Sequence, residues 1–190
     1  LLLTARFPDD EPETPLLQST GAEPEPAFRR VGAGLFRAAI RAAQHSDQVA
    51  LAVEHPRLAP YMETIEVFQR GRGRIACFGD LVVRANARSV YGTLGLRMSE
   101  ETVTGTSGLV AMGKGYRLWP TDAPLDVPLE ISFPESSGAA DAANIAIYRK
   151  SGNGWARQDT LRGGGRLTIH TGSLGVFAPM ADPVAPTITE

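Results

Sequence analysis

Three stretches decide the fold: Tyr116-Arg117-Leu118-Trp119-Pro120, Val127-Pro128-Leu129-Glu130-Ile131-Ser132-Phe133 and Ser173-Leu174-Gly175-Val176-Phe177-Ala178. In each of them, apolar residues recur at alternate positions between proline and glycine residues. A strand with one buried face needs this alternation, because successive side chains point to opposite faces. The last third of the chain is therefore predicted to form the closing strands of an antiparallel β-sandwich.

The composition is that of an ordinary globular protein. Of the 190 residues, 43% are hydrophobic and 21% charged, and the formal net charge is −2, which fits one large or two small domains. This balance gives no reason to expect nucleic acid or an anionic membrane as a partner. No apolar run approaches the roughly 18 residues of a membrane-spanning helix, so no span is predicted. The 20 glycines and 14 prolines favour short strands and many turns.

Cys77 is the only cysteine, so no disulfide can form within the chain. It lies in the strand-like stretch Arg74-Ile75-Ala76-Cys77-Phe78. A free cysteine in an apolar strand usually packs as a small hydrophobic side chain, and reactivity needs exposure and nearby positive charge. We therefore expect a buried, unreactive thiol.

Residues 1–27 are rich in proline and acidic residues, as in Pro8-Asp9-Asp10-Glu11-Pro12. Proline lacks a backbone donor and like charges repel, so a packed element is not expected. The prediction is an extended linker or arm. Phe7, Leu16 and Leu17 are the apolar residues that would fix it to a neighbour.

Residues 28–78 are predicted to form a small β unit. Val49-Ala50-Leu51-Ala52-Val53 and Met62–Gln69 alternate with period two. Residues 33–44 are ambiguous, because their alanines and arginines favour a helix whereas their alternation also fits an edge strand. We prefer the strand, since the segments that follow are strand-like, and leave the helix open.

Arg70-Gly71-Arg72-Gly73-Arg74 is predicted to be a turn within an antiparallel meander that spans residues 49–84. Arginine–glycine segments can contact RNA or phosphate. No aromatic residue lies within this one and the chain is slightly acidic, so a charged hairpin tip is the preferred interpretation.

Residues 79–180 are predicted to form the sandwich. Besides the stretches quoted first, strands are expected at Leu81–Arg84, Thr93–Met98, Asn144–Arg149, Gly154–Arg157 and Arg166–His170. Ser151-Gly152-Asn153-Gly154 predicts a hairpin and Gly163-Gly164-Gly165 a second turn, because glycine and asparagine adopt positive φ easily. Residues Glu100–Gly115 are expected to form a long polar loop.

From about Gly79 onward, the order of the segments resembles bacterial extracellular immunoglobulin-like modules related to the ZU5 sandwich. The matching segments are an opening strand at Ser89–Met98, a Tyr-Arg-Leu-x-Pro strand at Tyr116–Pro120, a strand at Pro128–Phe133, a hairpin at Ile145–Trp155 and a Leu-Gly-x-Phe-Ala strand at Leu174–Ala178. The resemblance lies in this ordered set. The first 78 residues match no family that we know.

Modules of this family accompany lysostaphin-type zinc metallopeptidases and other large secreted bacterial proteins. The resemblance therefore implies a non-catalytic accessory domain that works outside the cytoplasm: extracellular, at the cell surface or in the periplasm. Its partners would be neighbouring domains of the same polypeptide, other protein subunits or cell-wall components. Asp182–Ile188 is similar to the joints in such tandem arrays, so residues 181–190 are expected to form a linker to a following domain.

No combination of residues predicts a catalytic site, a metal site or a cofactor. Zinc ligands usually come in pairs at short spacing, and His45, His55 and His170 offer no such pair. His170 is expected to be a strand-end histidine. It directly precedes Thr171, which departs from the His-x-Ser/Thr pattern at which related sandwiches cleave themselves, so self-cleavage is not predicted.

Other polar residues are expected to lie in solvated loops. Ser107 lacks the Gly-x-Ser-x-Gly context of a hydrolase nucleophile. The spacing of three aspartates matches no calcium loop, and two adjacent glutamates give no evidence of a catalytic pair. These five residues are Asp122, Asp126, Asp141, Glu100 and Glu101.

The sequence thus predicts an all-β protein: an immunoglobulin-like antiparallel β-sandwich, a smaller β unit before it and an extended N-terminal arm. Tyr116, Trp119, Tyr148 and Trp155 are expected to fill or edge the core, and Trp155, at the hairpin end, is best placed for a binding surface. The predicted function is a non-catalytic structural or binding module of a secreted or cell-surface multidomain bacterial protein. Two alternatives stay open: a surface-layer or filament subunit that assembles through its arm, and an accessory part of a secreted hydrolase.

Overall fold

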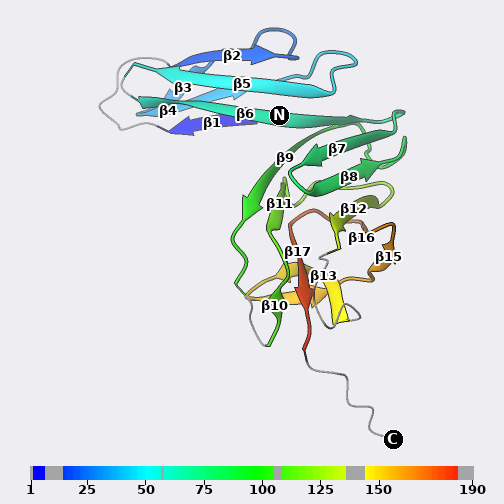
Figure 1. The fold of residues 1–190 in the computed structure, drawn as a ribbon. Helices are drawn as coiled ribbons and strands as arrows, with labels where there is room; N and C mark the ends of the chain where they lie inside the picture. The colour runs from blue at the N-terminus through cyan, green and yellow to red at the C-terminus, as the bar shows by residue number, and fades with distance from the viewer. Residues whose placement is uncertain (1, 7–14, 57, 105–107, 136–143, 184–190) are drawn as a thin grey trace, which may run out of the picture. The chain divides into compact units, whose positions relative to one another are not determined.

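The computed structural model describes residues 2–6, 15–56, 58–104, 108–135 and 144–183. Its named elements are all strands, which confirms the all-β class (Figure 1). The chain divides into two compact units, Leu1–Val67 and Phe68–Glu190, called unit 1 and unit 2 below. The predicted divisions after residues 27 and 78 differ from this one. Within the described residues, no helix has the length and apolar composition needed to cross a membrane.

Unit 1 is built from six strands in two layers. They are β1 (Leu2–Arg6), β2 (Leu16–Thr20), β3 (Arg29–Gly32), β4 (Leu35–Ala39), β5 (Gln48–His55) and β6 (Leu58–Gln69), whose last two residues belong to unit 2. One antiparallel layer has the order β1-β4-β3, and β6, β5 and β2 lie side by side in the other. Buried residues of both layers form one cluster: Leu17, Phe28, Phe36, Ala38, Ile40, Val49, Leu51, Val53, Ile65 and Val67.

The first 27 residues contribute two strands to unit 1, where we expected a linker or arm. β1 pairs with β4 and β2 pairs with β5. Leu17, which was expected to fix the arm to a neighbour, is 5% exposed and lies in the core of unit 1. The average composition of residues 1–27 concealed two short proline-free strands. Phe7 and the acidic run 9–13 lie outside the described residues.

The ambiguous segment 33–44 contains β4, so the preferred interpretation as a strand is confirmed. Phe36 and Ala38 are buried at alternate positions along it. Gly34, at φ 58°, lies in the turn between β3 and β4, a conformation that glycine adopts without steric cost. Pairing with β1 on one side and β3 on the other outweighs the helix propensity of alanine and arginine.

Unit 2 is a β-sandwich. Its strands are β7 (Arg74–Phe78), β8 (Leu81–Ala85), β9 (Thr93–Glu101), β10 (Val110–Ala111), β11 (Gly115–Trp119), β12 (Leu129–Pro134), β13 (Ile145–Ser151), β14 (Gly154–Arg157), β15 (Leu161–Gly163), β16 (Arg166–Thr171) and β17 (Val176–Ala181). One layer has the order β15-β16-β12-β8-β7, and the other has the order β14-β13-β17-β11-β9, with β10 paired to β17. Figure 1 shows β9, β11 and β17 on one side of this unit and β8, β12 and β16 on the other.

The core of unit 2 lies between these two layers and is centred on Tyr116. Tyr116 is 1% exposed, and its ring centroid is 6.0 Å from that of Phe78 and 5.9 Å from that of Phe133. Its hydroxyl accepts a hydrogen bond of 3.4 Å from the backbone N–H of Asp80, in the turn between β7 and β8. The prediction that Tyr116 fills the core is confirmed.

Both predicted tight turns of unit 2 are present. β13 and β14 are joined at Gly152-Asn153, with Gly152 at φ 56°. β15 and β16 are joined at Gly164-Gly165, whose φ angles are 59° and 71°. Positive φ at both central residues, as at Gly164-Gly165, is what a type I′ turn requires, whereas in the first turn only Gly152 has a positive φ, as in a type II′ turn.

Residues Arg70–Arg74 do not form the tip of a hairpin, so that prediction is wrong. β6 and β7, the strands before and after them, belong to different sheets. The segment therefore crosses between sheets, and its backbone N–H groups at Arg70 and Gly71 donate to the carbonyls of Gly92 and Ala87. These two hydrogen bonds join the segment to residues about 16 to 22 positions later in the chain. The local sequence alone does not distinguish such a crossing from a hairpin turn.

Candidate functional site: the tryptophan face

Both tryptophans of the chain lie on the outer surface of the layer β14-β13-β17-β11-β9. Alternation places them there, because Leu118 and Ile147 face the core of unit 2 while the next residues, Trp119 and Tyr148, face outward. Trp155 lies opposite Lys150, two residues beyond Tyr148, and so shares this side. We call this surface the tryptophan face, which comprises Arg97, Ser99, Glu101, Arg117, Trp119, Tyr148, Lys150, Trp155 and Arg157.

The strand register arranges these side chains in rows across the layer. Trp155 on β14 lies opposite Lys150 on β13, and Arg117 on β11 lies opposite Val176 on β17. β13 pairs with β17 as far as Arg149 opposite Phe177, and the same register continued by one residue gives the row Trp155, Lys150, Val176, Arg117. Neighbouring strands are about 4.8 Å apart, so β14 and β11 are about 14 Å apart.

Trp119 occupies the next row, beside Arg97. Trp119 is 41% exposed, and the guanidinium carbon of Arg97 lies 5.5 Å from its ring centroid. This is a cation–π contact, in which the positive charge meets the electron-rich face of the indole. Pro120 follows and ends the strand, because it has no backbone donor. Trp119 therefore edges the sandwich from outside and does not fill it.

Arg117 and Glu101 form a bidentate ion pair on the same face. Nη2 of Arg117 lies 2.6 Å from Oε1 of Glu101, and Nε lies 3.1 Å from Oε2. The hydrogen bonds from Arg117 lower the pKa of the Glu101 carboxyl below its ordinary value, and the ammonium of Lys150 lowers it further. Lys150 is thus within electrostatic range of this carboxylate.

The tryptophan face is more basic than the chain as a whole, whose net charge is −2. Its strand residues include one acidic residue, Glu101, and four basic residues: Arg97, Arg117, Lys150 and Arg157. Asp182, just after β17, adds a second carboxylate near Tyr148. Burial raises the pKa of the Tyr148 hydroxyl, and the charge of Asp182 raises it further. Positive charge is therefore concentrated on this side of unit 2.

The middle of the face is covered by the chain itself. Val103 and Leu109, between β9 and β10, pack against a second buried cluster formed by Ala146, Tyr148, Ala178 and Met180. Trp155 packs against the same cluster and is partly exposed. The indoles of Trp155 and Trp119 thus come from opposite sides of β13 and β17.

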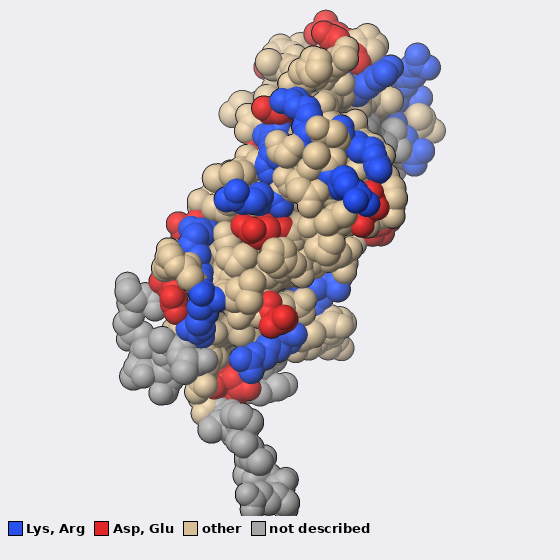
Figure 2. All heavy atoms as spheres, turned by 90° about the vertical axis from the view of Figure 1, so that its right-hand side faces the viewer, with Lys and Arg blue, Asp and Glu red and all other residues tan. Residues whose placement is uncertain are grey.

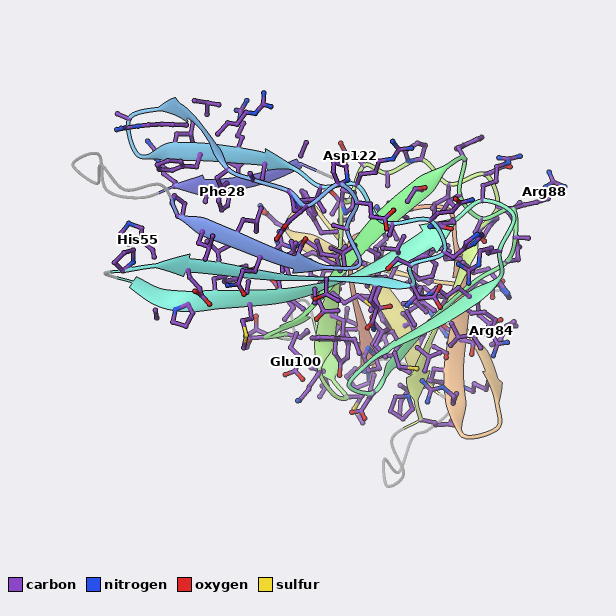
Figure 3. All side chains as sticks on the ribbon, turned by 90° about the horizontal axis from the view of Figure 1, so that it is seen from above. Phe28, His55, Arg84, Arg88, Glu100 and Asp122 are labelled. Atoms are coloured by element: carbon purple, nitrogen blue, oxygen red, sulfur yellow. The ribbon has the colours of Figure 1, made fainter. Side chains whose placement is uncertain are left out.

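The other layer of unit 2 has an outer surface of mixed charge. Nε of Arg84, labelled in Figure 3, lies 3.3 Å from Oε1 of Glu130, and Nε2 of His170 lies 3.9 Å from Oε2 of the same residue. Figure 2 shows basic and acidic side chains interspersed on the side that it draws. Alternating charges of this kind are typical of a solvated surface.

Unit 1 has an open hollow on the outer side of β2, β5 and β6. The small residues Ala50 and Ala52 line it together with Leu16 and Met62, which are 55% and 80% exposed. Gln18 and other polar residues complete the lining. The hollow contains neither an aromatic ring nor a cation, so it offers less specific chemistry than the tryptophan face.

The three histidines lie in separate places. His45 has φ 68° in a turn, and His55 is buried at the end of β5 (Figure 3). His170 is on β16, one residue before its end, as expected. Among the described residues, no group of three or more histidine, cysteine, aspartate and glutamate side chains could hold a metal ion.

Cys77 is exposed, so the prediction of a buried thiol is wrong. Alternation along β7 places Ala76, 3% exposed, in the core, and turns its neighbours outward, with Ile75 50% exposed. Every residue around Cys77 is apolar or small, and a shift of one residue in register exchanges the two faces. The local sequence could not tell which residues of this strand face inward.

The remaining sequence candidates form surface ion pairs or lie outside the described residues. Glu100 and Glu101 each pair with a cation and not with one another; Nζ of Lys114 is 2.7 Å from Oε1 of Glu100. Asp126 accepts a hydrogen bond of 3.2 Å from Arg70. Ser107 and Asp141 lie outside the described residues, and so does most of the expected linker 181–190.

No family model matches the chain, and no curated protein matches it. The immunoglobulin-like or ZU5-like identity of unit 2 therefore stays a prediction, whereas its sandwich architecture is observed.

Proposed function

We propose that this chain is a non-catalytic binding module of a secreted or cell-surface multidomain bacterial protein, and that it binds through the tryptophan face. One observation carries the proposal: both tryptophans face outward on the same layer, beside arginine and lysine side chains. Folding does not require this placement, because other aromatic and aliphatic residues fill the core of unit 2.

The physical chemistry of the face supports binding. Tryptophan and arginine are among the residue types that contribute most to binding energy, and a backbone that is already ordered loses little further entropy on binding. Here the backbone is a paired strand at each position: β9, β11, β13 and β14. A rigid strand holds a binding residue more accurately than a loop does.

The arrangement as two compact units fits a module that spaces other parts of a polypeptide. Each unit has a hydrophobic cluster of its own, and the two clusters share no residue. The extracellular or cell-surface location rests on the resemblance of unit 2 to secreted bacterial sandwich modules. Neighbouring domains and cell-wall components are the partners that this resemblance favours.

A cell-binding assay tests the proposal. We would incubate fluorescently labelled chain with intact cells and purified envelopes of the bacterium that produces it. Trp119→Ala with Trp155→Ala should reduce bound chain at least tenfold. Tyr91→Ala is the matched control, since Tyr91 is 59% exposed on unit 2 outside the tryptophan face, and should bind as the wild type does. Equal binding by the double variant, or no binding of the wild type to either preparation, would overturn the proposal.

A further inference from the structure

Building on that proposed function, we infer that the tryptophan face binds an acidic polysaccharide that carries carboxylate groups. Its sugar rings would stack on Trp119 and Trp155, and its carboxylates would pair with Lys150 and Arg157. The two indoles and these two cations lie on the strands β11, β13 and β14 of one face.

The layout fits an extended ligand. Trp155 and Trp119 lie on strands about 14 Å apart, and Lys150 is on β13, one of the two strands between them. A compact small molecule would need an enclosed pocket that buries most of its surface. A chain of sugar rings laid across the strands can instead contact one indole, then Lys150, then the second indole.

The aromatic groups suit sugars. An indole presents a broad apolar face, and a sugar ring has an apolar C–H face with hydroxyl groups around its edge. Trp119 is 41% exposed beside Arg97, and Trp155 is partly exposed and packs against the cluster that contains Tyr148. Stacking buries the apolar faces while the hydroxyl groups stay in contact with water or with side-chain acceptors such as Glu101.

The charged groups suit a polymer with sparse negative charge. Arg117 is already held by Glu101 through two hydrogen bonds. Lys150 and Arg157 are therefore the cations best placed to pair with the ligand, and such pairs are charge-assisted hydrogen bonds. Glu101 and Asp182 would repel a densely charged strand.

Nucleic acid fits the face less well. A single strand carries one phosphate per nucleotide and requires a continuous basic groove along its backbone. The tryptophan face instead intersperses carboxylates among its cations, and the chain has a net charge of −2. An acidic glycan, with a carboxylate on some rings only, matches this spacing better.

Intrinsic fluorescence provides a direct test, because both tryptophans of the chain belong to this face. The full chain would be titrated with hyaluronan, in which every second ring carries a carboxylate, and with neutral dextran, an oligothymidylate and polyglutamate. We expect hyaluronan to change the tryptophan emission and to bind at least tenfold more tightly than the other three. Raising the salt concentration from 50 to 500 mM should weaken that binding severalfold, since it depends on exposed charges.

Variants separate the contributions of charge and stacking. Lys150→Ala should weaken hyaluronan binding about tenfold, and Arg88→Ala, an exposed arginine outside the face, should leave it unchanged. Binding of dextran, oligothymidylate or polyglutamate with equal or greater affinity would overturn the inference, and so would an unaltered affinity in Lys150→Ala. Failure with hyaluronan leaves the proposed function standing if the double tryptophan variant still loses cell binding. If that variant binds cells normally, the proposed function itself fails.

Discussion

Arg117 donates two hydrogen bonds to Glu101 on the neighbouring strand, from Nη2 to Oε1 at 2.6 Å and from Nε to Oε2 at 3.1 Å. The planar guanidinium fits a carboxylate with both of its donors, which gives the pair a defined orientation. This pair orients Arg117 on the tryptophan face, in the row that also contains Lys150 and Trp155.

Glu101→Gln should lower the free energy of unfolding by roughly 0.5 kcal/mol at pH 7, because partly exposed ion pairs contribute between about 0.2 and 1 kcal/mol. The pKa of Glu101 is lowered from 4.5 in the folded protein. The contribution is therefore complete above about pH 4.5, the pKa in the unfolded chain, and is lost as the pH falls through the lower folded pKa. Urea denaturation at pH 7 and pH 3 checks this.

The matched control for that experiment is Arg117→Gln and its combination with Glu101→Gln. In a double-mutant cycle the two single variants should each lose the coupling, and the double variant should lose little more. Strict additivity of the two changes, or a stability difference that persists unchanged at pH 3, contradicts the pairing.

The two units should respond separately to cavities in their cores. Leu129→Ala and Leu51→Ala each truncate a buried leucine, 0% and 3% exposed, and each should cost about 3 kcal/mol. Tryptophan fluorescence reports on unit 2 alone, since Trp119 and Trp155 both belong to it. Denaturation followed by fluorescence should shift with Leu129→Ala and stay unchanged with Leu51→Ala. Equal shifts in both variants would mean that the two clusters unfold as one.

The turn between β15 and β16 gives a test of backbone conformation without a packing effect. Gly165 has φ 71°, and a Cβ added there would meet no atom within 4 Å. Gly165→Ala should therefore cost about 1 kcal/mol through the left-handed conformation alone. Gly163, which also has open space around it and no positive φ, is the control. An equal cost for Gly163→Ala would show that the turn conformation is not the cause.

Cys77 should react with a thiol reagent in the folded protein, at a rate close to that in denaturant, because its side chain is exposed. Moving the thiol by one position, in Ala76→Cys with Cys77→Ser, places it in the core and should slow the reaction at least a hundredfold. Rapid labelling of both proteins, or protection of native Cys77, contradicts the register of β7.

Alternating patterns in the sequence were enough to predict the sandwich of unit 2 and both of its tight turns. Trp119 and Tyr148 were predicted to fill or edge the core, and the periodicity of β11 and β13 explains why both face outward. Trp155 was predicted to be the residue best placed for a binding surface. The position of both tryptophans on the same face of one layer was not predictable from the sequence. It depends on β17 lying between β13 and β11, and this pairing joins segments far apart in the chain.

The failures have a common cause. Cys77 and the segment Arg70–Arg74 were interpreted from local sequence, whereas burial and sheet membership depend on pairing partners elsewhere. Leu17 was assigned to an arm because the surrounding composition is rich in proline, although five residues suffice for a strand once β5 supplies the hydrogen bonds. In each case tertiary pairing decided the outcome.

Selective quenching of tryptophan fluorescence tests the existence of the tryptophan face most directly. Iodide and caesium have the same quenching mechanism and opposite charge, so their ratio reports the charge around an accessible indole. Trp119→Phe and Trp155→Phe isolate each signal in turn. If both indoles are exposed beside arginine and lysine, the ratio of iodide to caesium quenching is higher for each of them than for free N-acetyltryptophanamide, and iodide quenches Trp119 more than Trp155. Protection of either indole from both ions, or a ratio no higher than that of the free compound, would contradict this account.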